Sequence, residues 1–165
     1  MKIIFRTFAF VAVTSALAAQ PVLAQSSGDM PVSATVLANC TVSAAPMVFG
    51  PITDFNAGNT DSTSTVVLSC SPNAAYEVQL NDGQNADGGQ RRLANIAASE
   101  FINYEVYTDP SRTTRWGDTI GSDTVSGIAS LAGASTLTVY GRISQGEPAV
   151  SVGAYTDLIT VTVNF

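Results

Sequence analysis

The stretch YTDLITVTVNF, residues 155–165, alternates apolar and polar side chains through its last seven positions. The apolar side chains on one face of this stretch belong to Ile159, Val161, Val163 and Phe165. A period of two is typical of a β-strand that buries one face, so Phe165 is predicted to be a core residue. Proteins usually protect the edge of such a strand with charge or proline, and positions 158–165 contain neither. The pattern therefore predicts an apolar strand whose second edge lacks a neighbour.

The rest of the chain has the same character, because apolar and Thr-rich runs alternate with Gly, Asn, Asp and Pro. No run keeps a helical period for three turns. The runs predicted to be strands are residues 30–38, 41–49, 64–70, 76–80, 91–95, 101–108, 124–130, 135–143 and 158–165. Strands of this number and spacing predict an all-β sandwich of two antiparallel sheets.

The first 24 residues have the three parts of a secretory signal peptide. Lys2 and Arg6 precede an apolar run over residues 7–19, and Val22-Leu23-Ala24 forms the expected cleavage site. An uncleaved membrane anchor is the alternative, but the apolar run is short for a bilayer span. We therefore expect export, with residues 1–24 removed.

The remaining chain is acidic. Loss of Lys2 and Arg6 leaves five Arg against thirteen Asp and Glu, a formal charge of −8. Such a chain is not expected to bind nucleic acid, which attracts basic proteins. Arg91 and Arg92 are adjacent, but two arginines do not make a nucleic-acid patch.

Catalytic chemistry has few candidates in this sequence. The chain has no His, which excludes Ser-His and Cys-His nucleophile systems and His-based metal sites. Glu100, Glu105 and Asp109 lie in one region, and we interpret them as solvated or turn residues. The sequence predicts no enzyme, no cofactor and no metal site.

Two further motifs are given structural interpretations. Residues 81–89, NDGQNADGG, are rich in oxygen ligands but lack the spacing of a calcium loop, so we predict a hairpin loop between two strands. Trp116 is the sole tryptophan. We predict that it closes the rim of the core, with sugar stacking as the alternative.

Cys40 and Cys70 are the only two cysteines. In an exported chain, one disulfide is the expected state of such a pair. The bond is predicted to tie the first strand of the folded domain to the second.

The segment before Cys40 also has the pattern of a strand. Its apolar face carries Met30, Val32, Ala34 and Val36. Only Ala38 and Asn39 separate residues 30–37 from Cys40, a reach too short for the segment to turn back across its own sheet. We infer that it fills the open edge of an identical subunit, since a head-to-tail contact of this kind generates a fibre. Pairing within its own domain, or disorder, is the alternative.

Several stretches resemble the spore coat protein U domain family, which includes the major pilin subunits of archaic chaperone-usher pili. They run in the order of the family across nearly the whole chain after residue 24. They are VSATVLANCTVSA (32–44), VVLSC (66–70), YEVYTDPSRTTRWGD (104–118), LTVYGRI (137–143) and YTDLITVTVNF (155–165).

The resemblance implies an incomplete immunoglobulin-like antiparallel sandwich with one disulfide, completed by a donor strand. It implies domains at residues 1–24 (signal peptide), 25–38 (donor-strand extension) and 39–165 (sandwich). The donor residues would be Met30, Val32, Ala34 and Val36. The groove that accepts a donor, and that contacts the chaperone, would include Ile159, Val161, Val163 and Phe165.

The expected function is that of a structural pilus subunit for adhesion and biofilm formation. Its expected partners are identical subunits, a periplasmic chaperone and an outer-membrane usher, and it is expected to pass through the periplasm to the cell surface. A secreted spore or cell coat protein and a monomeric carbohydrate-binding module are the alternatives.

Overall fold

The structure is a computed structural model that describes residues 23–165. Most of the predicted signal peptide, residues 1–22, lies outside the described residues. The chain divides into two units, Met1–Thr35 and Val36–Phe165. Within the described part, no helix is long and apolar enough to cross a membrane.

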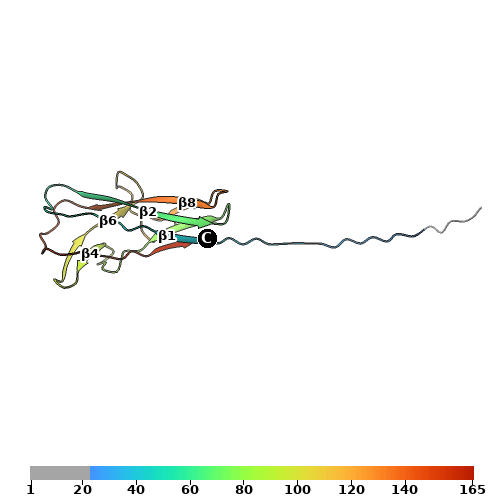
Figure 1. The fold of residues 1–165 in the computed structure, drawn as a ribbon, viewed down its shortest axis with the longest axis horizontal. Helices are drawn as coiled ribbons and strands as arrows, with labels where there is room; N and C mark the ends of the chain where they lie inside the picture. The colour runs from blue at the N-terminus through green and yellow to red at the C-terminus, as the bar shows by residue number, and fades with distance from the viewer. Residues whose placement is uncertain (1–22) are drawn as a thin grey trace, which may run out of the picture. The chain divides into compact units, whose positions relative to one another are not determined.

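Residues 36–165 form two antiparallel sheets and a hairpin (Figure 1). The four-stranded sheet has the order β1 (Cys40–Ala44), β2 (Thr60–Cys70), β8 (Ala134–Ile143) and β6 (Glu105–Tyr107). The three-stranded sheet has the order β7 (Val125–Ile128), β3 (Ala75–Leu80) and β9 (Val161–Asn164). The hairpin consists of β4 (Arg92–Asn95) and β5 (Glu100–Asn103). The prediction of an all-β fold with two antiparallel sheets is confirmed.

The core lies between the inner faces of the sheets. Its fully buried side chains include Val66 and Leu68 of β2, Val78 of β3 and Val106 of β6. Trp116 is also buried, and its indole Nε1 donates to the carbonyl of Val78 at 3.0 Å. A buried, hydrogen-bonded indole is a core residue, as the sequence predicted.

The run predicted as one strand over residues 101–108 is divided between β5 and β6. Ile102, Tyr104 and Val106 are all buried, so the predicted alternation is confirmed. The strand breaks at Tyr104 because β5 pairs with β4 while β6 pairs with β8. One continuous apolar pattern therefore contributes strands to two different sheets.

The loop at residues 81–89 was wrongly predicted as a hairpin. The strands on either side, β3 and β4, lie in different sheets and do not pair with each other. The Gly-Gly pair instead forms a tight turn within the loop. Gly88 and Gly89 both have positive φ and bring Asp87 opposite Gln90. This tight turn lies within a longer connection between the three-stranded sheet and the β4–β5 hairpin.

Two further predictions need correction. Phe165 is 57% exposed and is not a core residue, because β9 ends at Asn164 and no described strand covers its second edge. Residues 30–38, predicted as a strand, have no strand structure, and residues 23–39 are exposed throughout. A strand requires a hydrogen-bonded neighbour, and this segment pairs with no described strand.

Candidate functional site

On one side of the sandwich, each sheet ends in an edge strand, β1 in the four-stranded sheet and β9 in the three-stranded sheet. Among the described strands, β1 pairs only with β2, and β9 pairs only with β3. β1 and β9 lie close to each other, yet no backbone hydrogen bond joins them. The sandwich is thus open along one side, where each sheet presents free backbone donors and acceptors.

A groove of about 410 Å³ opens on this side, beyond the end of β1. Its rims are residues 44–49 and residues 157–161. Its floor consists of core side chains from four strands, namely Val66, Leu80, Val106 and Val139. An added strand would therefore place its side chains directly on the hydrophobic core.

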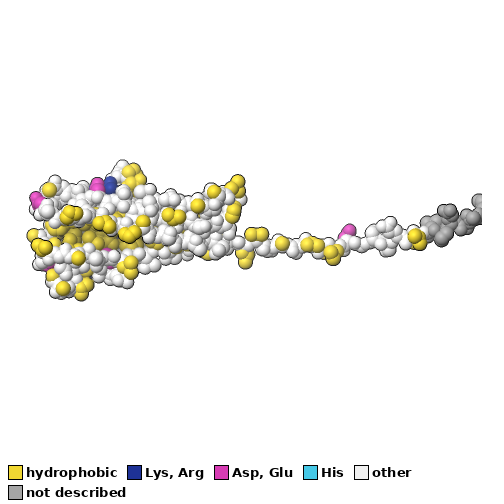
Figure 2. Space-filling model, in the orientation of Figure 1, with side chains coloured by type: hydrophobic (Ala, Val, Ile, Leu, Met, Phe, Trp, Pro, Cys, Tyr) yellow, Lys and Arg dark blue, Asp and Glu magenta, His cyan; other side chains and the backbone are white. Residues whose placement is uncertain are grey.

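The opening continues into a second cavity of about 960 Å³. Residues 47–56 and 149–157 line it, and it shares Met47, Phe49 and Leu93 with the first groove. Figure 2 shows apolar side chains gathered in a hollowed part of residues 36–165. We refer to the two cavities together as the apolar groove. Its length and apolar lining suit an extended peptide better than a compact polar ligand.

One rim of the groove is held against the four-stranded sheet. The hydroxyl groups of Ser62 and Ser64 donate to the carbonyls of Val48 (2.6 Å) and Ala45 (2.7 Å). Gly141 in β8 leaves the space that Met47 occupies, since a Cβ at position 141 would overlap its sulfur. The rim stays beside β2 although the strand itself ends at Ala44.

The other rim is anchored by Asp157. The hydroxyl of Tyr104 donates to Asp157 Oδ2 at 2.7 Å, and the backbone N–H groups of Gln84 and Asn85 donate to Oδ1 at 2.9 and 3.1 Å. Burial, followed by the contact with Asp157, raises the pKa of the Tyr104 hydroxyl, which therefore stays a donor. Gly83 has a φ of 85° and lies against Asp157, where a Cβ would overlap the carboxylate. These contacts hold the start of the stretch that leads into β9.

Arg91 fixes the same rim from inside the protein. It is fully buried, and its guanidinium donates to the carbonyls of Leu80 (2.7 Å), Asn81 (2.7 and 3.0 Å) and Trp116 (2.9 Å). Asn81 in turn exchanges hydrogen bonds with Thr160, at 3.1 Å through its N–H and 2.8 Å through its side chain. Arg91 therefore positions the residue that precedes β9.

Glu105 was predicted to be solvated, and this prediction is wrong. Its carboxylate pairs with Arg91 and, at 2.9 Å, with Arg115. The carboxylate of Glu100 is also bound within the protein, because it accepts hydrogen bonds from Ser151 and Tyr155. Asp109 is a turn residue as predicted, because it accepts hydrogen bonds from the backbone of Thr113 and Thr114. The prediction failed because the alternation of its strand placed Glu105 outside the core. Nothing in the sequence pattern indicated that Arg91 would be buried beside it.

The four residues predicted to line the groove differ in solvent exposure. Ile159, Val161 and Val163 are half-buried and pack against the core, whereas Phe165 is exposed. The four predicted donor residues, Met30, Val32, Ala34 and Val36, are all exposed. The rim at residues 44–49 was missed as a groove wall, although Pro46 already indicated that a regular strand would end there.

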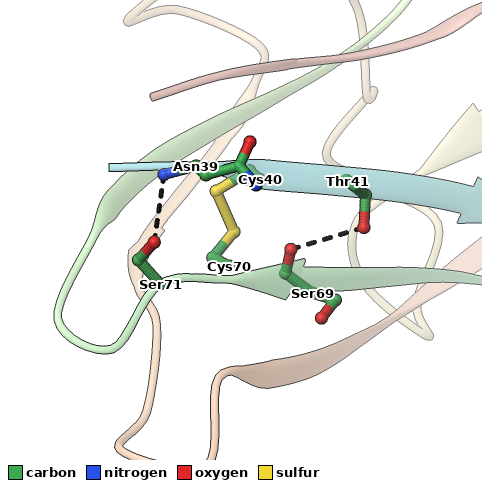
Figure 3. Close-up of a disulfide and its surroundings, with 6 residues drawn as sticks. All are labelled: Asn39, Cys40, Thr41, Ser69, Cys70 and Ser71. Carbon is green, nitrogen blue, oxygen red and sulfur yellow. Dashed lines mark hydrogen bonds between the residues drawn. A yellow bond between two sulfur atoms is a disulfide. The ribbon is translucent and has the colours of Figure 1, made fainter. Parts of the chain in front are cut away.

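The disulfide between Cys40 and Cys70 is confirmed (Figure 3). The two cysteines face each other in the register of β1 and β2, with a Cα–Cα distance of 4.0 Å. Beside the bond, the N–H of Ser71 donates to the carbonyl of Asn39 at 2.8 Å, and the N–H of Asn39 donates to Ser71 Oγ at 3.1 Å. The chain is therefore held to the sheet from Asn39 onward.

The sequence profile of the Spore Coat Protein U domain matches residues 26–162. The chain belongs to this family. The family expected from the sequence motifs is thereby confirmed.

Two individual proteins are similar to this family member. Protein U of Myxococcus xanthus is 26% identical over 109 residues, which cover 62% of this chain and 59% of Protein U. A chain in the crystal structure of the CsuC-CsuE chaperone-tip adhesion subunit pre-assembly complex, from archaic chaperone-usher Csu pili of Acinetobacter baumannii, matches with a TM-score of 0.59. That match has 24% identity and covers 79% of this chain and 41% of the other, and it establishes similarity of fold.

Proposed function

We propose that the protein is a structural subunit of a surface fibre that assembles by donor-strand exchange. In this proposal the segment around Met30 to Val36 of one copy adds as a strand beside β9 of another copy. Residues 1–24 direct export, residues 25–38 form the donor extension, and residues 39–165 form the acceptor sandwich. The fibre would serve adhesion and biofilm formation.

The observation that carries the proposal is an apolar groove beside an unpaired strand, in a chain that also has an exposed alternating apolar segment. Asn39 is fixed to Ser71, so only Leu37 and Ala38 lie between the fixed point and Val36. The Cα atom of Val36 is then at most about 11 Å from that of Asn39. This distance favours insertion into a neighbouring copy over return to the groove of the same copy.

The two apolar patterns also match in length. Four donor positions, 30, 32, 34 and 36, face four acceptor positions, 159, 161, 163 and 165. All strand pairs of the described sheets are antiparallel. An antiparallel donor would place Val36 beside Ile159 and Met30 beside Phe165. Such a donor must separate β1 from β9 and would cover the exposed Phe165.

A periplasmic chaperone and an outer-membrane usher are the proposed partners in assembly. Before polymerisation the groove would expose core side chains to solvent, which favours aggregation. A chaperone that lends a strand would cover the groove until another subunit arrives. The fold similarity to a chain of a chaperone-subunit pre-assembly complex supports this assignment.

The test compares two substitutions in the donor segment, expressed with the chaperone and usher. Val36→Asp places a carboxylate on the apolar face and is expected to abolish fibres, because burial of an unpaired charge is costly. Thr35→Asp, one position away on the opposite face, is the matched control and is expected to leave fibres intact. The readouts are electron microscopy and the ladder of subunit multiples that unheated fibres give on a denaturing gel. Normal fibres from Val36→Asp would contradict the proposal.

A coat protein that assembles without an usher is the second candidate. The match to the Spore Coat Protein U domain, and to Protein U, supports it. The two candidates differ in their genes, because only the pilus route requires adjacent chaperone and usher genes. Fibres that form normally after deletion of an adjacent usher gene would favour the coat protein.

A further inference from the structure

Two loops at opposite ends of β8 expose large apolar side chains. Residues 129–133 precede β8 and contain Leu131, which is 79% exposed, and Ile128 just before them is 71% exposed. Residues 148–156 follow β8 and contain Val152, which is fully exposed. Neither loop contains a charged residue, although the chain carries a net charge of −6. Uncharged loops of this kind can approach each other without the repulsion expected between acidic copies.

The Leu131 loop lies at the end where the donor segment joins the sandwich. The N–H of Cys70 donates to the carbonyl of Gly133 at 2.8 Å, and the N–H of Asn73 donates to the carbonyl of Ala129 at 3.1 Å. The next residue after Cys70, Ser71, is the one that holds Asn39. The loop and the root of the donor segment are therefore parts of one fixed arrangement.

Val152 lies beyond the opposite end of β8, beside the mouth of the apolar groove. It lines the larger cavity together with Val48, which is 71% exposed, and with Ile143 at the end of β8. Hydrogen bonds from Ser151 to Glu100, at 2.7 and 2.9 Å, hold this loop against the β4–β5 hairpin. Val152 thus projects from a restrained position.

Donor-strand exchange would bring these two ends together. In this arrangement Val36 lies beside Ile159 of the acceptor. The Cα atom of Asn39 is then at most about 11 Å from that of Val36. Continued in register, the donor chain would pass Asp157 and reach Thr156 of the acceptor. The Leu131 loop of the incoming subunit, which is fixed to Asn39 through residues 70–73, would then lie over residues 150–156 and Val48 of its neighbour.

We propose that the fibre contains a second contact between copies of this chain, in which Ile128 and Leu131 of one subunit pack against Val48 and Val152 of the next. This inference rests on the proposed donor-strand exchange and adds a docking surface to it. Leu37 and Ala38 alone would leave a flexible joint. An apolar contact beside the joint fixes the angle between subunits and removes these four side chains from water.

Cross-linking of assembled fibres tests the contact. Leu131→Cys and Val152→Cys are introduced together into the full chain, and the fibres are treated with a flexible bismaleimide and boiled in detergent with reductant. The described residues contain no free cysteine that would react. We expect multimers that survive boiling from the double variant and none from either single variant. The matched control, Ile120→Cys with Val152→Cys, uses another exposed residue, in the loop that precedes β7, and is expected to give no multimers.

The outcomes separate this inference from the proposed function. Fibres of the double variant that show an unheated ladder but leave only monomers after boiling would overturn the second contact and leave donor-strand exchange standing. Cross-linking of the single Leu131→Cys variant to itself would also overturn it, because the donor would then run parallel to β9. Wild-type chain that forms neither fibres nor a ladder would overturn both proposals.

A second variant covers the case in which the double cysteine variant does not fold. Leu131→Ser is a mild change at an exposed site, and its fibres are expected to bend more, with a shorter persistence length in electron micrographs. Ile120→Ser fibres are expected to match the wild type. Equal stiffness of Leu131→Ser and wild-type fibres would contradict the second contact.

Discussion

At the scale of single residues, Arg91 shows how a buried charge can hold the rim of a groove in place. A buried charge is tolerated only when it is paired and its hydrogen bonds are satisfied. Arg91 meets both conditions through Glu105 and three backbone carbonyls. Two of those carbonyls belong to Leu80 and Asn81, where β3 ends and the contact with Thr160 begins. The interior thus determines where the groove rim lies.

We predict that Arg91→Met lowers the free energy of unfolding by about 3 to 5 kcal/mol, because it leaves Glu105 and the carbonyls without their partner. Urea unfolding followed by tryptophan fluorescence measures the loss. Arg92→Met is the control, since Arg92 pairs with exposed Asp87 and stacks on Phe101, and about 1 to 2 kcal/mol is expected there. Equal losses in the two variants would show that Arg91 has no special role.

At the scale of elements, the alternation within most strands was predictable, whereas the strand partners were not, apart from the β1–β2 pair that the disulfide indicated. The period of two placed Ile102, Tyr104 and Val106 inside, as observed. It did not show that β5 and β6 belong to different sheets, because that division depends on long-range pairing with β4 and β8. Asp157 and Arg91 were missed for the same reason. Their roles come from partners distant in sequence, such as Tyr104 for Asp157 and Trp116 for Arg91.

The central pair of strands, β2 and β8, carries an acid-sensitive contact. Arg142 donates to both carboxylate oxygens of Asp61, at 2.8 and 2.9 Å, and this contact foremost lowers the pKa of Asp61. The stabilisation is complete above the unfolded pKa, about 3.9, and is lost as the pH falls through the lower folded value. We predict that Asp61→Asn reduces the drop in urea midpoint between pH 6 and pH 3. An unchanged drop would contradict this role.

The disulfide acts on the pairing of β1 with β2. It closes a loop with a sequence separation of 30 residues, for which the chain-entropy relation gives about 3 to 4 kcal/mol. We predict that Cys70→Ser lowers the periplasmic yield of the subunit, because the unfolded chain is no longer restricted. The Cys40→Ser, Cys70→Ser double variant is the control for reactions of the freed thiol. Wild-type yield and assembly in both variants would refute the structural role of the bond.

At the scale of the whole molecule, the proposed donor segment and the apolar groove are separate parts of one chain. The segment belongs largely to the unit Met1–Thr35, and the groove belongs entirely to Val36–Phe165. Among the described residues, those that line the groove all lie between Ala44 and Val161. Damage to one part is therefore expected to leave the other intact.

Deletion of residues 25–37 is predicted to leave a subunit that folds and binds its chaperone but cannot extend a fibre. Val161→Asp is predicted to abolish both chaperone binding and fibre formation. Val161 lines the groove and pairs with Leu80, so the carboxylate would enter an apolar site at a cost of several kcal/mol. Thr162→Asp, on the exposed face of the same strand, is the control and should retain both activities.

Co-purification with the chaperone and electron microscopy of cells distinguish the variants. Normal fibres from the deletion would refute donor-strand exchange through Met30 to Val36. Chaperone binding by Val161→Asp would instead show that the chaperone recognises a surface other than the groove.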